Sequence, residues 1–394
     1  MLLRVPMRAA YSCRITQLLS SVVVCALALV SGCSKDSVKG QQDWRTVLAH
    51  QEVTSRIDTT PVCLSCLSLD RVLKVDGDAS PEAMDETSNV AIDSLGRLWV
   101  GQRNAVSVFS EKGAFIGSVG KRGSGPGEFQ ANGPMFTDAR GHVHIFDQVL
   151  FRESVFDEKL ALLSERLHAP GAIQDVASLV GSDSVLVNAE FADETRVGLP
   201  LHILTSRGFT RSFGADGDVI RAASGHLLRQ VATSQDGYVF AAHRYTHEIS
   251  VFAPSGTAIR TYQFAHSWRP PVGGVPSTLT LKSDLWGFVQ DVQYDPLGLL
   301  VVLSWDPKSN WRDLVEERRD PDGRPYLQEK SDAVSLYKSR ISVIDLNRQK
   351  VVSTVQVGTA LWGLLGASKV YGFEYSALGE PQLAVFSLSL KLAN

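Results

Sequence analysis

The feature that most constrains this chain is a segment pattern that recurs along most of its length. Residues 86–120 contain four short runs rich in apolar and β-branched residues, NVAID, RLWVGQ, AVSVFS and AFIGSVG, joined by SLG, RN and EKG. Short alternating runs separated by glycine- or asparagine-bearing turns are typical of antiparallel strands. The segment therefore predicts a four-stranded antiparallel meander.

The same pattern returns five more times, and the spacing of the copies predicts the architecture. A reference position can be chosen in each copy, two residues before the pair of core residues in its second strand. These positions are Gly96, Gly141, Asp183, Gly237, Gly298 and Ser368, and the intervals between them are 45, 42, 54, 61 and 70 residues. Propeller blades of the WD40 or kelch type take about 40–50 residues, so the three later intervals hold inserts. Six such units predict an all-β, six-bladed β-propeller built of four-stranded antiparallel blades.

The last repeat contains only three strand patterns before the chain ends. The segment 68–75, SLDRVLKV, precedes the first meander and belongs to no complete one. We expect it to pair with AVFSLSL (384–390) and so to close the ring with an N-terminal strand.

The glycine-rich segment KRGSGPGEF (121–129) resembles a phosphate-binding loop only in composition. No Lys-Ser/Thr pair and no helix pattern follow it, because Asn132-Gly133-Pro134 would interrupt a helix. Its position between the first and second meanders predicts a crossover between blades, with Phe129 filling the gap between them.

The N-terminal residues 1–32 predict a signal peptide. Three arginines precede an apolar run at 18–30, which is short for a membrane span. The run ends in Val30-Ser31-Gly32-Cys33, which resembles the lipobox of bacterial lipoproteins. This resemblance implies diacylglycerol and palmitate on Cys33, anchoring in the cell envelope and, because Ser34 follows, the outer membrane in a Gram-negative host. The alternative is an ordinary signal peptide with an incidental cysteine.

Residues 33–62 predict a polar tether and residues 63–394 the propeller. Cys63 and Cys66 are candidates for a disulfide, or for two free thiols, since no second Cys pair or His pair is present to complete a zinc site. The chain has 39 Lys and Arg against 42 Asp and Glu with no basic block, which argues against a nucleic-acid partner.

A family resemblance supports this architecture. The segment GSGPGEF, preceded by IDSLGRLWVGQRNAVSVFSEKGAFIGSVG, resembles NHL-repeat six-bladed propeller lipoproteins of bacterial envelopes, clearly so over residues 86–165. Relatives with known chemistry include lactonases, a streptogramin lyase and peptidyl-hydroxyglycine lyases, which use a metal or acid-base residues at the channel mouth. None of their motifs matches this chain residue by residue, so no catalytic residue, metal ligand or cofactor is assigned.

Two groups of residues are candidates for ligand binding. The inserts at 191–200, 265–284 and 305–335 should share one rim of the propeller, and long inserts in compact domains are often functional. They carry residue types common in binding hot spots, namely Trp268, Arg269, Trp305, Trp311, Arg312 and Tyr326. A second set falls near the starts of inner strands, at the channel mouth, namely Asn89, Asp175, Gln230 and Asp291.

These observations favour a binding or scaffold protein of the envelope that recognises a protein, peptide or glycan on its long-loop rim. Two alternatives remain: a metal-dependent lyase or lactonase acting at the channel mouth, and a structural subunit of an envelope assembly. For the rim residues there is a separate alternative, in which the inserts only cap the channel and their aromatic residues pack upon it.

Overall fold

The structure is a computed structural model of the 394-residue chain. Residues 42–394 form one compact unit, separate from residues 1–41. The described residues are 53–76, 79–80, 84, 89–102, 104–168, 171–179, 183–191, 198–214, 228–264, 281, 285–323, 325–330 and 336–391.

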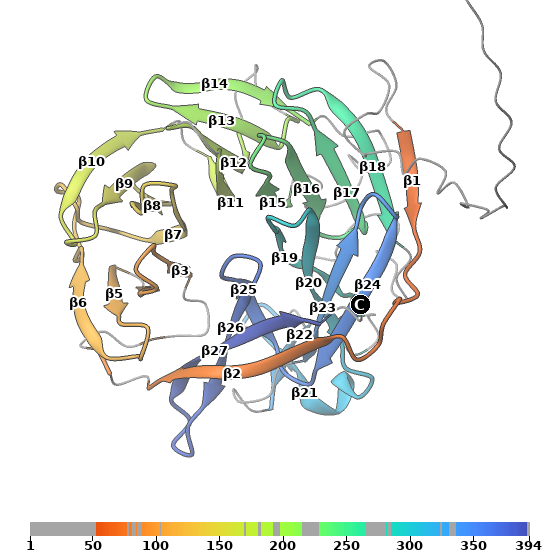
Figure 1. Ribbon diagram of the computed structural model, residues 1–394. Helices are drawn as coiled ribbons and strands as arrows, with labels where there is room; N and C mark the ends of the chain where they lie inside the picture. The colour runs from red at the N-terminus through yellow and green to blue at the C-terminus, as the bar shows by residue number, and fades with distance from the viewer. Residues whose placement is uncertain are drawn as a thin grey trace, which may run out of the picture. The chain divides into compact units, whose positions relative to one another are not determined.

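Six four-stranded antiparallel units follow one another around an axis, each with its first strand innermost (Figure 1). The first unit contains β3 (Val90–Ile92), β4 (Leu98–Gln102), β5 (Ala105–Phe109) and β6 (Phe115–Val119). The second contains β7 (Asn132–Thr137), β8 (Val143–Asp147), β9 (Arg152–Phe156) and β10 (Leu162–Leu167). The third contains β11 (Ala172–Ser178), β12 (Val185–Glu190), β13 (Leu201–Thr205) and β14 (Gly208–Phe213).

The remaining three blades repeat this order. The fourth contains β15 (Arg229–Thr233), β16 (Val239–His243), β17 (Glu248–Phe252) and β18 (Ala258–Phe264). The fifth contains β19 (Phe288–Tyr294), β20 (Leu299–Pro307), β23 (Tyr337–Asp345) and β24 (Lys350–Val357). The sixth contains β25 (Leu361–Leu364), β26 (Lys369–Tyr375), β27 (Pro381–Leu390) and β2 (Leu67–Val75). The predicted six-bladed β-propeller is confirmed.

Ring closure by an N-terminal strand is also as predicted. Strand β2 pairs antiparallel with β27, from Leu67 opposite Leu390 to Val75 opposite Leu383. The edge that the three-stranded sixth repeat would leave open is therefore covered.

Local turn chemistry explains why each blade folds as a meander. In the turn between β3 and β4, Asp93 Oδ1 accepts hydrogen bonds from the backbone N–H groups of Leu95 and Arg97, at 3.0 and 2.9 Å. Gly96 follows with a φ of 76°, a conformation that glycine adopts without strain. The first turns of the second and fifth blades repeat this arrangement with Asp138 and Asp295 as the acceptors.

The core lies between blades rather than within them. One buried cluster joins Trp99 and Val106 of the first blade to Val143 and Ile145 of the second. Phe129, which has no exposed surface, belongs to this cluster, so the predicted role of KRGSGPGEF as a crossover is confirmed. Its conformation is held by backbone bonds such as Phe129 N to Lys121 O at 2.9 Å.

The segment before β2 also belongs to the propeller, although residues 33–62 were predicted to be a tether. Strand β1 (Val53–Ile57) pairs in parallel with β18 and adds a fifth strand to the fourth blade. Ile57 is buried there. The segment then runs along β24, where Val62 N and Cys63 N donate to Val351 O and Val352 O. Residues 53–75 thus connect the outer edges of the last three blades.

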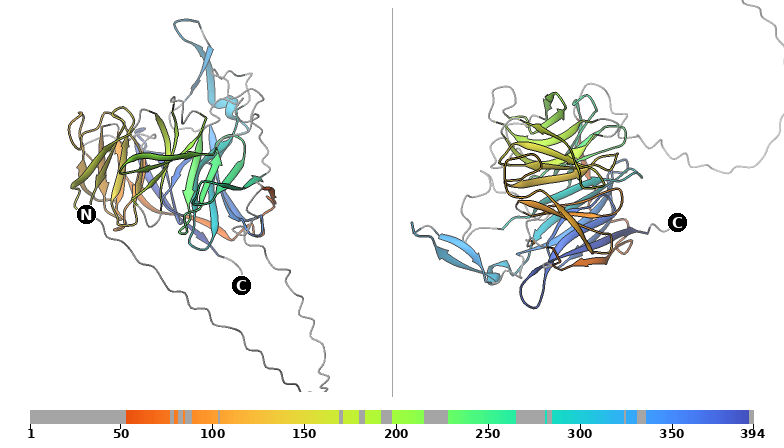
Figure 2. Two further views of the ribbon diagram at one scale, coloured as in Figure 1. Left: turned by 90° about the horizontal axis from the view of Figure 1, so that it is seen from above. Right: turned by 90° about the vertical axis from the view of Figure 1, so that its left-hand side faces the viewer.

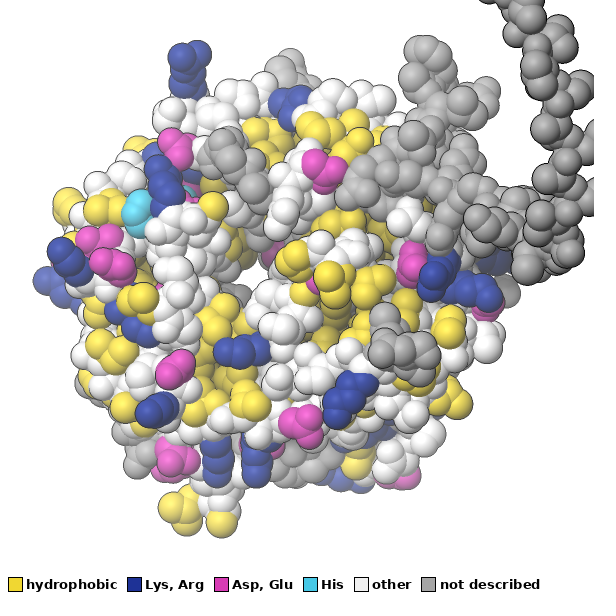
Figure 3. All heavy atoms as spheres, viewed as in Figure 1, with side chains coloured by type: hydrophobic (Ala, Val, Ile, Leu, Met, Phe, Trp, Pro, Cys, Tyr) yellow, Lys and Arg dark blue, Asp and Glu magenta, His cyan; other side chains and the backbone are white. Residues whose placement is uncertain are grey.

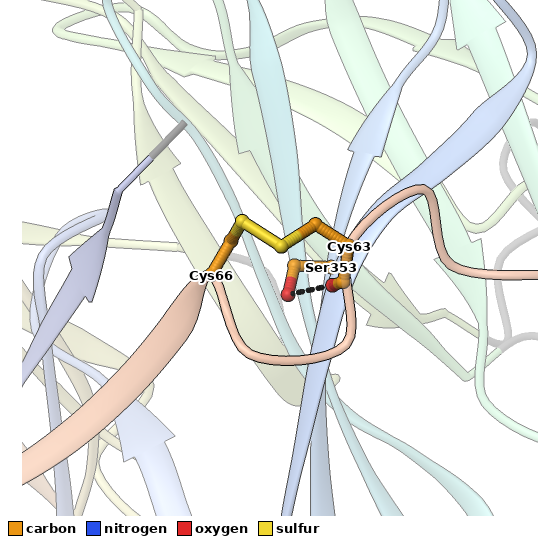
Figure 4. Close-up of a disulfide and its surroundings, with 3 residues drawn as sticks. All are labelled: Cys63, Cys66 and Ser353. Carbon is orange, nitrogen blue, oxygen red and sulfur yellow. Dashed lines mark hydrogen bonds between the residues drawn. A yellow bond between two sulfur atoms is a disulfide. The ribbon is translucent and has the colours of Figure 1, made fainter. Parts of the chain in front are cut away.

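A disulfide links Cys63 to Cys66 at the point where this segment turns into β2 (Figure 4). The hydroxyl of Ser353 on β24 donates to the carbonyl oxygen of Cys63 at 2.6 Å. Lys391 N donates to Cys66 O at 2.8 Å, so the turn is attached to the fifth and sixth blades at once.

The fifth blade carries an insert between its second and third strands. This insert contains the short helix η2 (Trp311–Leu314) and a hairpin of β21 (Val315–Arg319) with β22 (Pro325–Glu329). Figure 2 shows the hairpin projecting from one face of the ring. None of the helices found in the described residues is long and apolar enough to cross a membrane.

Candidate functional site

A cavity of about 570 Å³ lies along the axis of the ring, surrounded by the inner strands of all six blades. Seen from the face opposite the β21–β22 hairpin, the surface is hollowed at the centre of the ring (Figure 3). The four residues that the sequence predicted at the channel mouth, Asn89, Asp175, Gln230 and Asp291, all line this cavity. They come from the first, third, fourth and fifth blades, and their role in binding stays a prediction.

Asp175 is held by the backbone of two blades. Its Oδ1 accepts a hydrogen bond from Val176 N at 2.9 Å, and its Oδ2 accepts one from Val231 N of β15 at 2.7 Å. The side-chain amide of Gln230, oriented to satisfy its neighbours, donates to the same Oδ2 and to Gln290 O at 3.2 Å. The carboxyl group therefore ties the third blade to the fourth.

Asp291, two blades further on, makes the equivalent contacts with backbone amides. Its Oδ1 accepts from Val292 N at 2.7 Å and its Oδ2 accepts from Leu364 N of β25 at 2.6 Å. In both strands the pairing register shifts at the preceding residue, Gln174 or Gln290. Such a bulge re-aims the side chains beside it.

A repeated tripeptide in the sequence marks this pair. Gln-Asp-Val occurs at 174–176 and again at 290–292, at matching positions of two blades. The residues that sequence reasoning missed, Gln174, Gln290 and Arg244, also line the cavity. The repeated tripeptide could have identified the two glutamines, because each lies directly before one of the predicted aspartates.

The two carboxyl groups are electrostatically coupled. Both face the cavity and so keep some contact with solvent, but they lie deep within the ring. Burial raises the pKa of Asp175 to about 7, although two backbone amides and the charge of Arg244 lower it. Burial also raises the pKa of Asp291 well above its usual range, and the negative charge of Asp175 adds to this effect. Near neutral pH the pair therefore carries less than two negative charges.

Arg244 is the basic residue among the described residues that line the cavity. It begins the turn between β16 and β17, and its guanidinium lies over the ring of Phe288, 4.6 Å from the centroid. Nη2 donates to Gln290 Oε1 at a long 3.4 Å, and the buried Nε has no hydrogen-bond partner within the described part of the chain.

Aromatic side chains connect the cavity to the base of the insert. Trp362, which lines the cavity, lies 4.9 Å from Trp305 between ring centroids, and Trp305 lies 5.3 Å from Tyr337. Tyr337 in turn packs against a small buried cluster that contains Trp311 and Val315. The row of rings thus runs from the axis to the β21–β22 hairpin.

The predicted rim residues fall into three groups. Trp305 and Trp311 are only 8% and 4% exposed, so their rings support the rim from beneath instead of presenting a contact surface. Arg312 lies 4.5 Å from the Trp311 ring and donates from Nε to Leu281 O, whereas Tyr326 on β22 is 40% exposed. Trp268 and Arg269 lie outside the described residues, as does Cys33.

The burial of the two tryptophans corrects the expectation that both would be contact residues. Trp305 belongs to β20 itself, and its Nε1 donates to Leu361 O of the next blade at 2.6 Å. Trp311, the first residue of η2, packs with Leu285 and Val315 in a small buried cluster. Large aromatic rings at the base of an insert are buried because they provide most of its apolar area.

Over the part of the chain that the structure describes, no three His, Cys, Asp or Glu side chains are grouped so that they could hold a metal ion. In the cavity, each oxygen of Asp175 and Asp291 already accepts a backbone N–H. The described lining of the cavity offers hydrogen-bonding side chains, the Arg244 guanidinium and aromatic rings.

The fold and the axial cavity define the chain as a six-bladed β-propeller, and comparison with known proteins agrees. The profile of the family DUF5128, described as a six-bladed β-propeller, matches residues 84–149. No curated protein matches the chain.

Solved structures show the same fold at low sequence identity. A predicted exported protein from Bacteroides fragilis is 12% identical, with a TM-score of 0.55 over 87% of this chain and 100% of that one. A DUF4221 family member from Bacteroides vulgatus is 10% identical, with a TM-score of 0.54 over 83% and 99%. A virginiamycin B lyase from Staphylococcus aureus is more distant, with a TM-score of 0.43, 10% identity and coverage of 82% and 99%.

Proposed function

We propose that this chain is an exported, lipid-anchored binding propeller, which recognises a protein, peptide or glycan through its axial cavity and the rim that carries the insert. The observation that carries the proposal is the cavity, because side chains from all six blades line it and its volume of about 570 Å³ falls within the range of ligand sites. A site of this kind forms only when the ring is complete.

The rim with the insert is the side from which we expect the ligand to approach. Inner strand β19 begins at Phe288, opposite Trp305, and β20 ends two residues further on, at Pro307, where the insert begins. Arg244 and Trp362 line the cavity and contact Phe288 and Trp305 of this aromatic row. Exposed Tyr326 extends the potential contact area outward.

Export and anchoring rest on the leader and on the disulfide. The segment ending at Cys33 has the features of a lipoprotein signal, and disulfides such as Cys63–Cys66 persist in oxidising compartments. A fatty-acid probe fed to the native host should label the wild-type protein and leave Cys33→Ser unlabelled. A labelled Cys33→Ser variant would refute the lipid anchor.

Binding is tested by photo-crosslinking in the native envelope. A benzophenone amino acid replaces Tyr326 on the insert in one strain and Leu297 in another. Leu297 is 84% exposed in the turn between β19 and β20 of the same blade, at the opposite rim. We expect a discrete adduct from position 326 that disappears with Trp362→Ala, and none from position 297. Adducts from position 297 alone would contradict the proposed binding rim.

A further inference from the structure

We propose that Arg244 is a carboxylate-binding residue and that the ligand of the axial cavity presents a carboxylate group to it. This inference rests on the proposed function, since it assigns a ligand class to the same cavity. Three features of Arg244 support it: the way the residue is held, its unused donors and the charge around it.

The backbone of Arg244 is fixed on both sides. Arg244 N donates to Leu228 O at 3.1 Å, and Val289 N donates to Arg244 O at 2.9 Å, which links the fourth blade to the fifth. In the turn that follows, His243 Nδ1 accepts hydrogen bonds from Tyr245 N and Thr246 N, both at 3.0 Å. A ligand would therefore meet a residue whose position is set before binding.

The guanidinium is also oriented, by stacking on a ring that is itself packed. Phe288 lies 5.3 Å from Trp305 and 5.4 Å from Tyr337 between centroids. A cation on an aromatic face gains a favourable interaction while its N–H groups point outward in the plane of the guanidinium.

Those N–H groups are largely unused. A guanidinium has five donors, and in the described part of the chain this one makes a single long hydrogen bond, to Gln290 Oε1. The buried Nε has no partner there. In the described part of the chain no hydrogen bond joins Asp175 to Arg244, because the Asp175 oxygens are directed at the backbone amides of Val176 and Val231. The planar fork of donors suits a carboxylate, which can accept two parallel hydrogen bonds.

The nearby acids do not exclude an anion. The titratable residues among the described lining of the cavity are Asp175, Asp291, Tyr371 and Arg244. Burial raises the pKa of Asp175 to about 7 and that of Asp291 well above its usual range, and burial also raises the pKa of Tyr371. The two acids can therefore take up protons near neutral pH, and an incoming carboxylate would favour their protonated forms further.

The test uses small carboxylates with the purified propeller and nuclear magnetic resonance titration. N-Acetylglycine represents the end of a peptide and glucuronate an acidic sugar, while N-acetylglycinamide and glucose are their uncharged controls. We expect one carboxylate to bind and its control to bind at least about tenfold more weakly, with a similar loss in Arg244→Gln, as is usual for a charge-assisted hydrogen bond. Arg244→Lys, which keeps the charge without the planar fork, should lie between them.

The pH dependence of the binding affinity tests whether the bound group is negatively charged. Affinity for the carboxylate should rise from pH 8 to pH 6, as the acids take up protons, and Asp175→Asn should bind at least as tightly as wild type with a flatter profile. Absence of carboxylate binding, tighter binding at high pH, or unchanged affinity in folded Arg244→Gln would each overturn the inference. An adduct from position 326 that persists in Arg244→Gln and is lost in Trp362→Ala would refute the role of Arg244. That result would still support the proposed binding function of the propeller.

Discussion

Replacing Phe129 by alanine should weaken the contact between the first two blades. Phe129 has no exposed surface and packs in the cluster formed by Trp99, Val143 and Phe156, with its ring centroid 6.3 Å from that of Phe156. It comes from the crossover, so neither blade can supply the ring from its own strands.

The expected cost follows from the burial of the ring. A buried phenylalanine removes about 150–250 Å² from water, and at about 25 cal/mol per Å² this is worth about 4–6 kcal/mol, part of which an alanine retains. Adding the cost of the cavity that remains, Phe129→Ala should lower the free energy of unfolding by about 3–5 kcal/mol. The ring packs directly on Gly120, where an added Cβ would lie 2.3 Å from it, and Gly120 has no side chain that could refill the space.

Equilibrium unfolding in urea, followed by tryptophan fluorescence, measures this change. The matched control is Phe115→Ala, because Phe115 lies on β6 of the first blade but is 38% exposed. The control should lose about 1 kcal/mol. If Phe129→Ala lost no more than the control, or less than about 1.5 kcal/mol, the role of Phe129 in joining the blades would be refuted.

Three further outcomes follow from the structure. Deleting residues up to 79, which include β2, should expose the edge of β27 and cause aggregation, and a soluble, cooperatively folding truncation would contradict ring closure. Replacing Cys63 and Cys66 together by serine should cost about 2 kcal/mol in urea unfolding, because the bond closes a loop of only a few residues, and a loss above about 4 kcal/mol would be inconsistent with this loop-closure account. Burial alone would raise the pKa of Glu153, but hydrogen bonds from His144 and Arg166 outweigh it and hold this pKa below its usual range. Ionised Glu153 therefore contributes its full stabilisation of the folded state above the ordinary glutamate pKa of about 4.3, and this contribution is lost as the pH falls below that value. Glu153→Gln should make the free energy of unfolding less dependent on pH in the acid range, and an unchanged pH dependence would contradict this assignment.

Much of the propeller could be predicted because its blades are local structures. The Asp93 turn uses hydrogen bonds to residues two and four positions away, and similar turns recur at Asp138 and Asp295. Strand alternation and such turns are readable in the sequence because both depend on near neighbours. The absence of a fourth strand in the last repeat, together with the unassigned segment 68–75, was enough to predict how the ring closes.

The candidate site could be predicted only in part. The positions of Asp175 and Asp291 near the starts of inner strands followed from aligning the repeats, and both line the cavity. Arg244 was missed because a single arginine in a turn has no signature until the ring brings it beside Phe288. The burial of Trp305 and Trp311 was missed for the same reason, since their partners come from the next blade or from distant parts of the insert.

The amino-acid sequence by itself therefore determined the blade, the number of blades and the closing strand, because these depend on alternation, turn residues and repeat length. Only the tertiary structure decided which side chains meet at the axis and which become buried. It also raised the pKa of both Asp175 and Asp291 by desolvation, and that of Asp291 further by the charge of Asp175, because these effects exist only once separate blades enclose the two groups in one cavity. The parallel pairing of β1 with β18 has the same origin, since a short strand pattern does not specify which of several outer edges it will join.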